Sequence, residues 1–128
     1  MQRSISLGLA MLAGAAFGAF AISGLSAQSK APGAYAVIDI SDITDADTFV
    51  KQLLPKTTPA MEAFGGRYII RTDKITAIDG TAPKRYVVIG FDSMDKAKAW
   101  ENSAAQKEID ALRAKSTKSR AFFVDGAL

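Results

Sequence analysis

The sequence predicts a small α+β domain whose elements follow the order strand, helix, strand, strand, helix, strand. Two observations predict it. Four short segments alternate apolar and polar residues or are rich in β-branched and aromatic residues, as strands are. Two longer segments, one after the first of these strands and one after the third, carry apolar residues at helical spacing. Four antiparallel strands with both helices on one face of the sheet satisfy this order.

Residues 1–27 are expected to be a signal peptide that is cleaved on export. Arg3 gives a positive start, and no further charge occurs before Lys30, in a stretch rich in Ala, Gly, Leu and Phe that closes with small residues. An uncleaved membrane anchor is the alternative, but the glycines of this stretch lower its helix propensity and its affinity for lipid. We therefore expect cleavage after Ala27 or a residue or two away, a periplasmic location, and no stable membrane association after cleavage.

The globular domain is expected over residues 34–128, after a short lead. Residues 28–33 are polar or small and include a proline, which predicts that this lead is exposed. The first strand, residues 34–40, places its even-numbered residues on one face and its odd-numbered residues on the other.

The first helical segment follows Thr44, which is expected to cap it. Asp45 and Asp47 would then lie in the first turn, near the positive end of the helix dipole. Apolar residues continue at helical spacing, but Pro55 and Pro59 each remove a backbone donor and crowd the preceding turn. The pattern predicts either a kinked helix or two short ones, which end at a Gly-Gly pair.

The second and third strands are expected over residues 67–71 and 85–91. They are joined by the turn-rich segment 72–83, in which residues 75–78 could continue the pairing. The third strand alternates, so its two faces have different roles.

The second helical segment can be capped by Ser93, and Trp100 lies on its apolar face. Ser103 and Gln106 have the spacing of a capping box, which predicts a break near Asn102 and a restart of the helix.

The last strand is expected over residues 121–124 and completes a β-α-β-β-α-β order, which is the ferredoxin-like arrangement. Because both helices cover the same face of the sheet, the other face must be solvated, bind a ligand or meet another sheet.

Composition excludes several kinds of chemistry. Cysteine and histidine are both absent, which excludes disulfides, thiol nucleophiles, Ser-His and Cys-His dyads, His-ligated haem and ordinary zinc or copper sites. No Asp-x-Asp-x-Asp-Gly calcium loop occurs, so we expect neither a metal nor another cofactor. The net charge is only +3, so the sequence predicts no nucleic-acid partner.

Arg71 is the first candidate for ligand binding. Period two in its strand places it beside Arg67 and Ile69 and away from Tyr68. A guanidinium that faces a closed sheet interface needs an anionic partner, either Asp39 of the first strand or the carboxylate of a ligand. The alternatives are an Arg-Asp pair that only fixes a dimer, and simple exposure to solvent.

Three aromatic residues are further candidates. Trp100, the only tryptophan, is expected either to pack in the core or to line a pocket. Tyr35 and Tyr86 share the sheet face opposite the core, where they could donate hydrogen bonds in a cavity or pack at an interface.

Several motifs, in this order and spacing, resemble a bacterial family known as domain of unknown function 1330. They are Ala34–Val37, Gly65–Arg71, Pro83–Arg85, Phe91–Met94, Ala97, Ala99–Trp100, Ser103 and Phe123–Gly126. The resemblance covers almost the whole mature domain. It implies a ferredoxin-like fold, a homodimer that pairs as a dimeric α+β barrel through the open sheet faces, and a pocket between each sheet and its helices or partner.

The chain departs from the family at three places. The family often has His where this chain has Phe64, an aromatic residue where it has Glu101, and a Pro-Glu-Tyr run where it has residues 104–106. The family's activity is not established, so the resemblance transfers no catalytic residue.

Three hypotheses for the function remain. The first is a binding module that holds a small apolar or anionic molecule in the pocket. The second is a cofactor-independent enzyme, similar to a monooxygenase or an isomerase, that uses the same pocket, by analogy of fold alone. The third is a purely structural dimer whose sheets bury each other.

Overall fold

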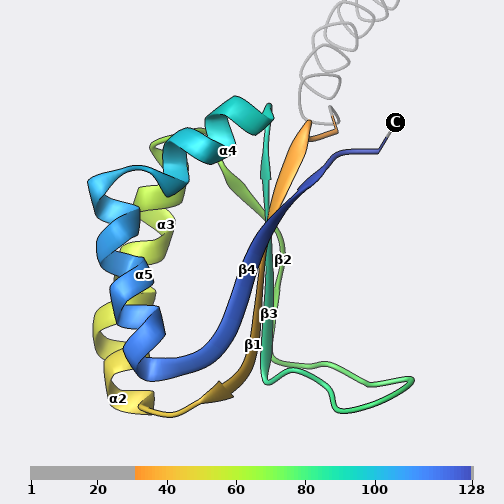
Figure 1. Ribbon diagram of the computed structural model, residues 1–128, viewed down its shortest axis with the longest axis vertical. Coiled ribbons are helices and arrows are strands. Elements are labelled where there is room, and N and C mark those ends of the chain that lie inside the picture. Colours follow the sequence, from red (N-terminus) through yellow and green to blue (C-terminus); the bar gives the residue numbers. More distant parts are fainter. Residues whose placement is uncertain (1–30, 128) are drawn as a thin grey trace, which may run out of the picture. The chain divides into compact units, whose positions relative to one another are not determined.

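The computed structural model describes residues 31–127 (Figure 1). The predicted signal peptide and its cleavage position lie outside these residues, as do residues 28–30 of the predicted lead. Within them, no helix has the length and apolar character needed to cross a membrane. The elements are β1 (Ala34–Ile43), α2 (Ala46–Thr48), the π-helical turn η1 (Phe49–Leu53), α3 (Leu54–Glu62), β2 (Arg67–Thr72), β3 (Arg85–Phe91), α4 (Met94–Glu101), α5 (Ala104–Ser116) and β4 (Thr117–Asp125).

The four strands form one antiparallel sheet in the order β2-β3-β1-β4. The helices cover one face of this sheet and leave the other face open (Figure 1). The ferredoxin-like fold class predicted from the sequence is therefore confirmed. We call the face under the helices the core face and the other the open face.

The first helical segment begins at Asp45, so the prediction that Thr44 caps it is wrong. The Asp45 carboxylate accepts hydrogen bonds from Thr48 Oγ1 at 2.8 Å and from Thr48 N at 3.1 Å. These bonds lower the pKa of Asp45. Thr44 N and Asp45 N both donate to the carbonyl of Ser116, at 2.8 Å and 3.1 Å, so this turn is held against the end of α5.

The two prolines divide this segment, as the pattern predicts. The turn η1 ends where α3 begins, and Pro55 stands in the first turn of α3. The change of helical type therefore falls where the missing N–H of Pro55 interrupts the hydrogen-bond ladder. Pro59 lies inside α3. The chain then turns at Gly65, whose φ of 77° is readily adopted only by glycine.

The second helical segment also follows the prediction. Ser93 accepts a hydrogen bond from Lys96 N and caps α4, and Ser103 accepts one from Gln106 N and caps α5, both at 3.2 Å. Ser103 Oγ also donates to the carbonyl of Trp100 at 2.7 Å. Ser103 therefore bonds both the end of α4 and the start of α5, which fixes the break at Asn102.

Two expectations for the strands are wrong. Residues 75–78 form no strand, and Ile78 is 97% exposed, because this loop leaves the end of the sheet and projects away from the helices without a partner strand (Figure 1). The last strand is longer than residues 121–124 and begins at Thr117, because β1 continues past Ile40 through a register shift and pairs with it.

The core lies between the core face and the helices. Phe91 is fully buried at its centre, with its ring centroid 5.3 Å from that of Trp100. Gly66 allows this close packing, since a Cβ atom there would lie 2.6 Å from Met61 Cγ and 2.8 Å from Phe91 Cε1. A second group of buried residues surrounds Phe49 and Ile109.

A bulge in β2 determines which side chains reach the helices. Tyr68 pairs with Ile89 and Ile70 with Val88, so Ile69 is the extra residue. Arg71 then pairs with Val87. Since Ile89 and Val87 belong to the core face, Tyr68 and Arg71 lie on that same face. The prediction that Arg71 lies away from Tyr68 on the open face is therefore wrong.

Candidate functional site

An apolar cavity of about 50 Å³ lies between the core face and the helices. Its walls include Ile38, Ile40, Val87 and Ile89 from the sheet and Phe49, Leu53 and Ile109 from the helical segments. By this measure about 10–15 Å³ is enough for one water molecule, so the cavity has room for a small apolar group of a ligand.

Two larger pockets share walls with this cavity. The arginine pocket, of about 470 Å³, shares Leu54, Thr57, Arg71 and Arg85 with it. The α5–β4 pocket, of about 510 Å³, shares Ile38, Trp100, Gln106 and Arg113 with it. The cavity therefore borders two pockets of different chemistry.

In the arginine pocket, both guanidinium groups lie against aromatic rings. Arg71 Cζ is 4.4 Å from the ring centroid of Tyr68, and Arg85 Cζ is 5.9 Å from that of Phe49. Hydroxyl groups of Thr57 and Thr58 hydrogen-bond the Tyr68 hydroxyl at 3.2 Å and 3.0 Å and hold its ring in place. Among residues 31–127, no carboxylate forms an ion pair with Arg71 or Arg85. Neither positive charge at this opening is thus neutralised by a paired carboxylate of the described chain.

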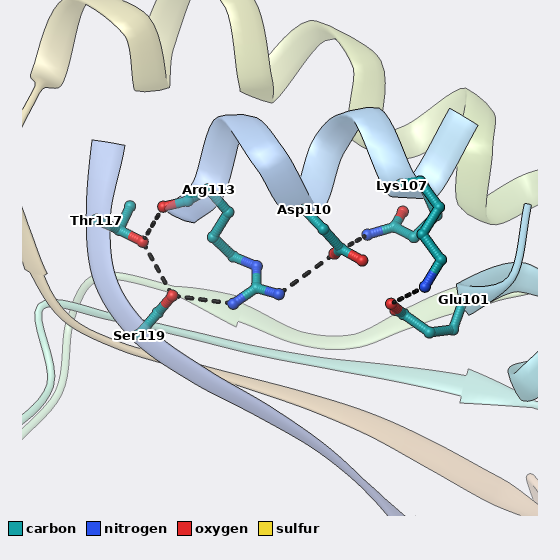
Figure 2. A network of polar contacts seen from close by, with 7 residues as sticks. Glu101, Lys107, Asp110, Arg113, Thr117 and Ser119 are labelled. Atoms are coloured by element: carbon teal, nitrogen blue, oxygen red, sulfur yellow. Dashed lines mark hydrogen bonds and ion pairs between the residues drawn. The ribbon is translucent and has the colours of Figure 1, made fainter. Parts of the chain in front are cut away.

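In the α5–β4 pocket, by contrast, the charged groups are tied together (Figure 2). Arg113 donates from Nη2 to Asp110 Oδ1 at 3.2 Å and from Nη1 to Ser119 Oγ at 3.0 Å. Gln106 Nε2 donates to the same Asp110 oxygen at 3.1 Å. Glu101 Oε2 lies 3.6 Å from Lys107 Nζ. This network links α4, α5 and β4.

The carboxyl groups of Glu101 and Asp110 shift each other's pKa. Burial, then a hydrogen bond with Asp110 and the negative charge of Asp110, raise the pKa of Glu101 to about 7. Burial also acts to raise the pKa of Asp110, but hydrogen bonds from Glu101, Gln106 and Arg113 outweigh it, and the net pKa is lowered. Below about pH 7 the pair therefore carries one proton, mainly on Glu101.

This pair makes folding stability depend on pH. Because the folded state raises the Glu101 pKa from 4.5 to about 7, its contribution is fully present below pH 4.5 and is lost as pH rises through about 7. Urea unfolding between about pH 4 and about pH 8 measures this decline. The Glu101→Gln variant cannot ionise, so its stability should lack the decline; an identical decline in the variant would contradict the assignment.

Trp100 forms part of the wall of both the apolar cavity and the α5–β4 pocket. The residue is 4% exposed, and its Nε1–H is a buried donor without an acceptor in the described part of the chain. Buried donors in native proteins nearly always have a partner, so this N–H is available to a ligand.

The predicted site residues fall into two groups. Arg71 and Trp100 line the same cavity. Tyr35 and Tyr86 lie together on the open face, as predicted, and so does Asp39. The Asp39 carboxylate accepts a hydrogen bond from Arg120 Nε at 3.3 Å, so the predicted alternative of an Arg71–Asp39 pair is wrong, because the bulge carries Arg71 to the other face.

Sequence reasoning did not identify five residues that line these pockets. The five are Arg85, Glu101, Gln106, Asp110 and Arg113. The spacing of residues 106, 110 and 113 does place them on one face of a helix. Glu101 and Gln106, however, stand where the chain departs from the family pattern, so the resemblance drew attention away from them. Within residues 31–127, no group of three or more acidic side chains could hold a metal ion.

Comparison with solved structures shows the same fold. A protein of unknown function from Rhodopseudomonas palustris matches with a TM-score of 0.62 and 10% identity over 84% of this chain and 92% of that one. SnoaB, a cofactor-independent oxygenase from Streptomyces nogalater, matches with a TM-score of 0.53 and 12% identity over 77% of this chain and 96% of that one. A search of curated proteins gives no significant match.

Comparison with protein families gives the assignment directly. Residues 33–127 match the family described as a domain of unknown function, DUF1330. This match covers nearly all of the chain that the structure describes. The chain belongs to the DUF1330 family.

Proposed function

We propose that the domain binds a small molecule with a carboxylate or similar anionic group and an apolar part. The anionic group would lie between Arg71 and Arg85, and the apolar part would extend toward the cavity beneath them. The observation that carries this proposal is the presence, within residues 31–127, of two guanidinium groups at one opening with no carboxylate paired to either.

The geometry favours an anion in particular. Arg85 belongs to β3 and Arg71 to β2, and both lie on the core face at the same end of the sheet. Guanidinium groups bind carboxylates through paired hydrogen bonds, and the planar face of each remains free to stack on an aromatic ring. Lys74 adds a third positive charge to the pocket wall, against the one negative charge of Asp73.

The size of the cavity limits the ligand. At about 50 Å³, it accepts only a short apolar chain or the edge of a ring unless side chains move. The anionic group itself has the wider arginine pocket, of about 470 Å³, so we expect a compact ligand with its charge at one end.

Hexanoate and its neutral analogue hexanamide test this proposal. The single tryptophan lines the cavity, so its fluorescence should report an apolar chain that enters. We expect hexanoate to bind, and Arg71→Gln or Arg85→Gln to weaken it about tenfold, the loss expected for a charge-assisted hydrogen bond. Arg120→Gln is the matched control because Arg120 pairs with Asp39 on the open face. Equal binding of hexanamide, or unchanged affinity in both variants, would refute an anion site.

The homodimer is the second part of the proposal. Ile69, Ile70, Phe122 and Val124 are 40–45% exposed, and the pairing of their strands places them on the open face. Exposed apolar side chains gathered on one face are typical of an interaction surface. A second copy with the same face would cover them, and the predicted signal peptide would deliver this dimer to the periplasm. N-terminal sequencing of fractionated cells tests the export.

A cofactor-independent enzyme is the second candidate function. It is favoured by one observation, the Glu101 carboxyl group that holds its proton to about pH 7 at the wall of a pocket. A group of this kind can exchange a proton with a substrate at neutral pH. Recovery of quinols and lactones unchanged after incubation with the protein would leave binding as the function.

A further inference from the structure

The α5–β4 pocket differs from the arginine pocket in its chemistry, although both open onto the same cavity. We propose that the α5–β4 pocket is a separate binding site for a neutral small molecule that presents a carbonyl oxygen to Trp100 Nε1 and to the carboxyl group of Glu101. This site does not depend on the anion site proposed above.

The volume of the pocket suits such a molecule. At about 510 Å³, it falls within the range of roughly 300 to 1,000 Å³ that is usual for small-molecule sites. Ile38, Ala121 and Phe123 supply its apolar surface. The side chains of α5 and the end of α4 supply the polar surface, so the walls match a molecule with an apolar body and a polar edge.

The charges around the pocket favour a neutral ligand. Asp110 is paired with Arg113 at 3.2 Å, and Arg120 of β4 with Asp39 at 3.3 Å. An ionic ligand would have to displace one of these partners. A neutral ligand leaves both pairs intact, and it meets Glu101 in its uncharged, protonated form.

Two hydrogen-bond donors belong to residues that border the pocket. Trp100 Nε1 is buried without an acceptor in residues 31–127, and Trp100 and Glu101 both line the pocket. A carbonyl oxygen has two lone pairs and no proton, so it can accept from both donors. When the protonated Glu101 carboxyl donates its hydrogen bond to the ligand, Asp110 still accepts hydrogen bonds from Gln106 and Arg113. A ligand that only donates hydrogen bonds would leave the indole N–H unpaired.

The Glu101 donor exists only while its carboxyl group is protonated. The charged groups around it are Lys107, Asp110 and Arg113 from α5. Arg120 of β4 also borders the pocket, but its guanidinium pairs with Asp39 on the open face. Burial and Asp110 hold its pKa near 7 against the effect of Lys107. Affinity for a carbonyl compound should therefore be highest below pH 7 and fall above it.

The single tryptophan provides the measurement. In the full chain labelled with ¹⁵N, the only indole N–H signal belongs to Trp100. Cyclohexanone and methylenecyclohexane, which have similar shapes and differ at the oxygen, serve as probes. We expect cyclohexanone to move the indole signal to lower field in a saturable manner, to bind roughly tenfold more weakly above pH 8 than at pH 6, and to bind much more tightly than the hydrocarbon.

Two variants test whether the Glu101 proton and the α5–β4 pocket account for this binding. Glu101→Gln keeps a donor without a titrating proton, so cyclohexanone should bind at both pH values alike. Arg71→Gln should leave cyclohexanone binding unchanged even if it abolishes hexanoate binding, which distinguishes failure of this site from failure of the anion site. Equal binding of the two probes, or the same pH dependence in Glu101→Gln as in the natural chain, would overturn the proposal.

Discussion

Replacing Phe91 with alanine should lower the free energy of unfolding by about 3–5 kcal/mol, the usual cost of removing a large buried aromatic side chain. Phe91 has no exposed surface and contacts the ring of Trp100. Its ring also fills the space against which Gly66 packs. Natural domains have only about 5–15 kcal/mol of stability in total, so this one change should remove a large part of it. Urea unfolding followed by circular dichroism measures the loss.

Val50→Ala is the matched control for this experiment. Val50 is also apolar, but it is 56% exposed in η1, so its truncation should change stability by no more than about 0.5 kcal/mol. Similar losses in both variants would show that Phe91 is not at the centre of the core.

Placing a carboxylate on the open face should convert the proposed dimer to monomers. Phe122 of the edge strand β4 pairs with Val37 of β1 on this face and is 40% exposed. In Phe122→Asp, each copy would bring a charge into the apolar interface, where burial without a counter-charge is costly. Light scattering after gel filtration at micromolar concentration should give the mass of two chains for the natural protein and of one for the variant.

Ile78→Asp controls for the added charge. Ile78 is 97% exposed in the loop between β2 and β3, which lies beyond the end of the sheet. This variant should remain dimeric. If the natural protein is already monomeric, or Phe122→Asp has no effect on mass, the open face is not the dimer interface.

The order of elements could be read from the sequence because each signal is local. Alternation defines the strands, and the caps at Ser93 and Ser103 need only the residues that follow them. The choice between Thr44 and Asp45 as a cap could not be made this way. Both have a side-chain oxygen suited to a cap, and the sequence does not show which of them reaches the backbone N–H of Thr48, as Asp45 does.

The candidate site was predictable only in part for the same reason. Trp100 reaches the cavity through an apolar helical face that the sequence displays. The Glu101–Asp110 pair instead requires the break at Asn102, which turns α5 back so that Asp110 lies near the end of α4. No pattern in the sequence gives the distance across that turn, and a lone acidic residue on each helix indicates nothing by itself.

The bulge at Ile69 means that the task of Arg71 depends on how β2 pairs with β3 rather than on composition. If the strand paired regularly from Tyr68 onward, Ile70 would take the place opposite Val87, and Arg71 would emerge on the sheet surface that is proposed to meet a partner. The helix-covered cavity would then receive isoleucine instead of a guanidinium. A slip of one residue in a single strand could thus exchange a ligand-binding arginine for an interface arginine without altering any side chain's chemistry.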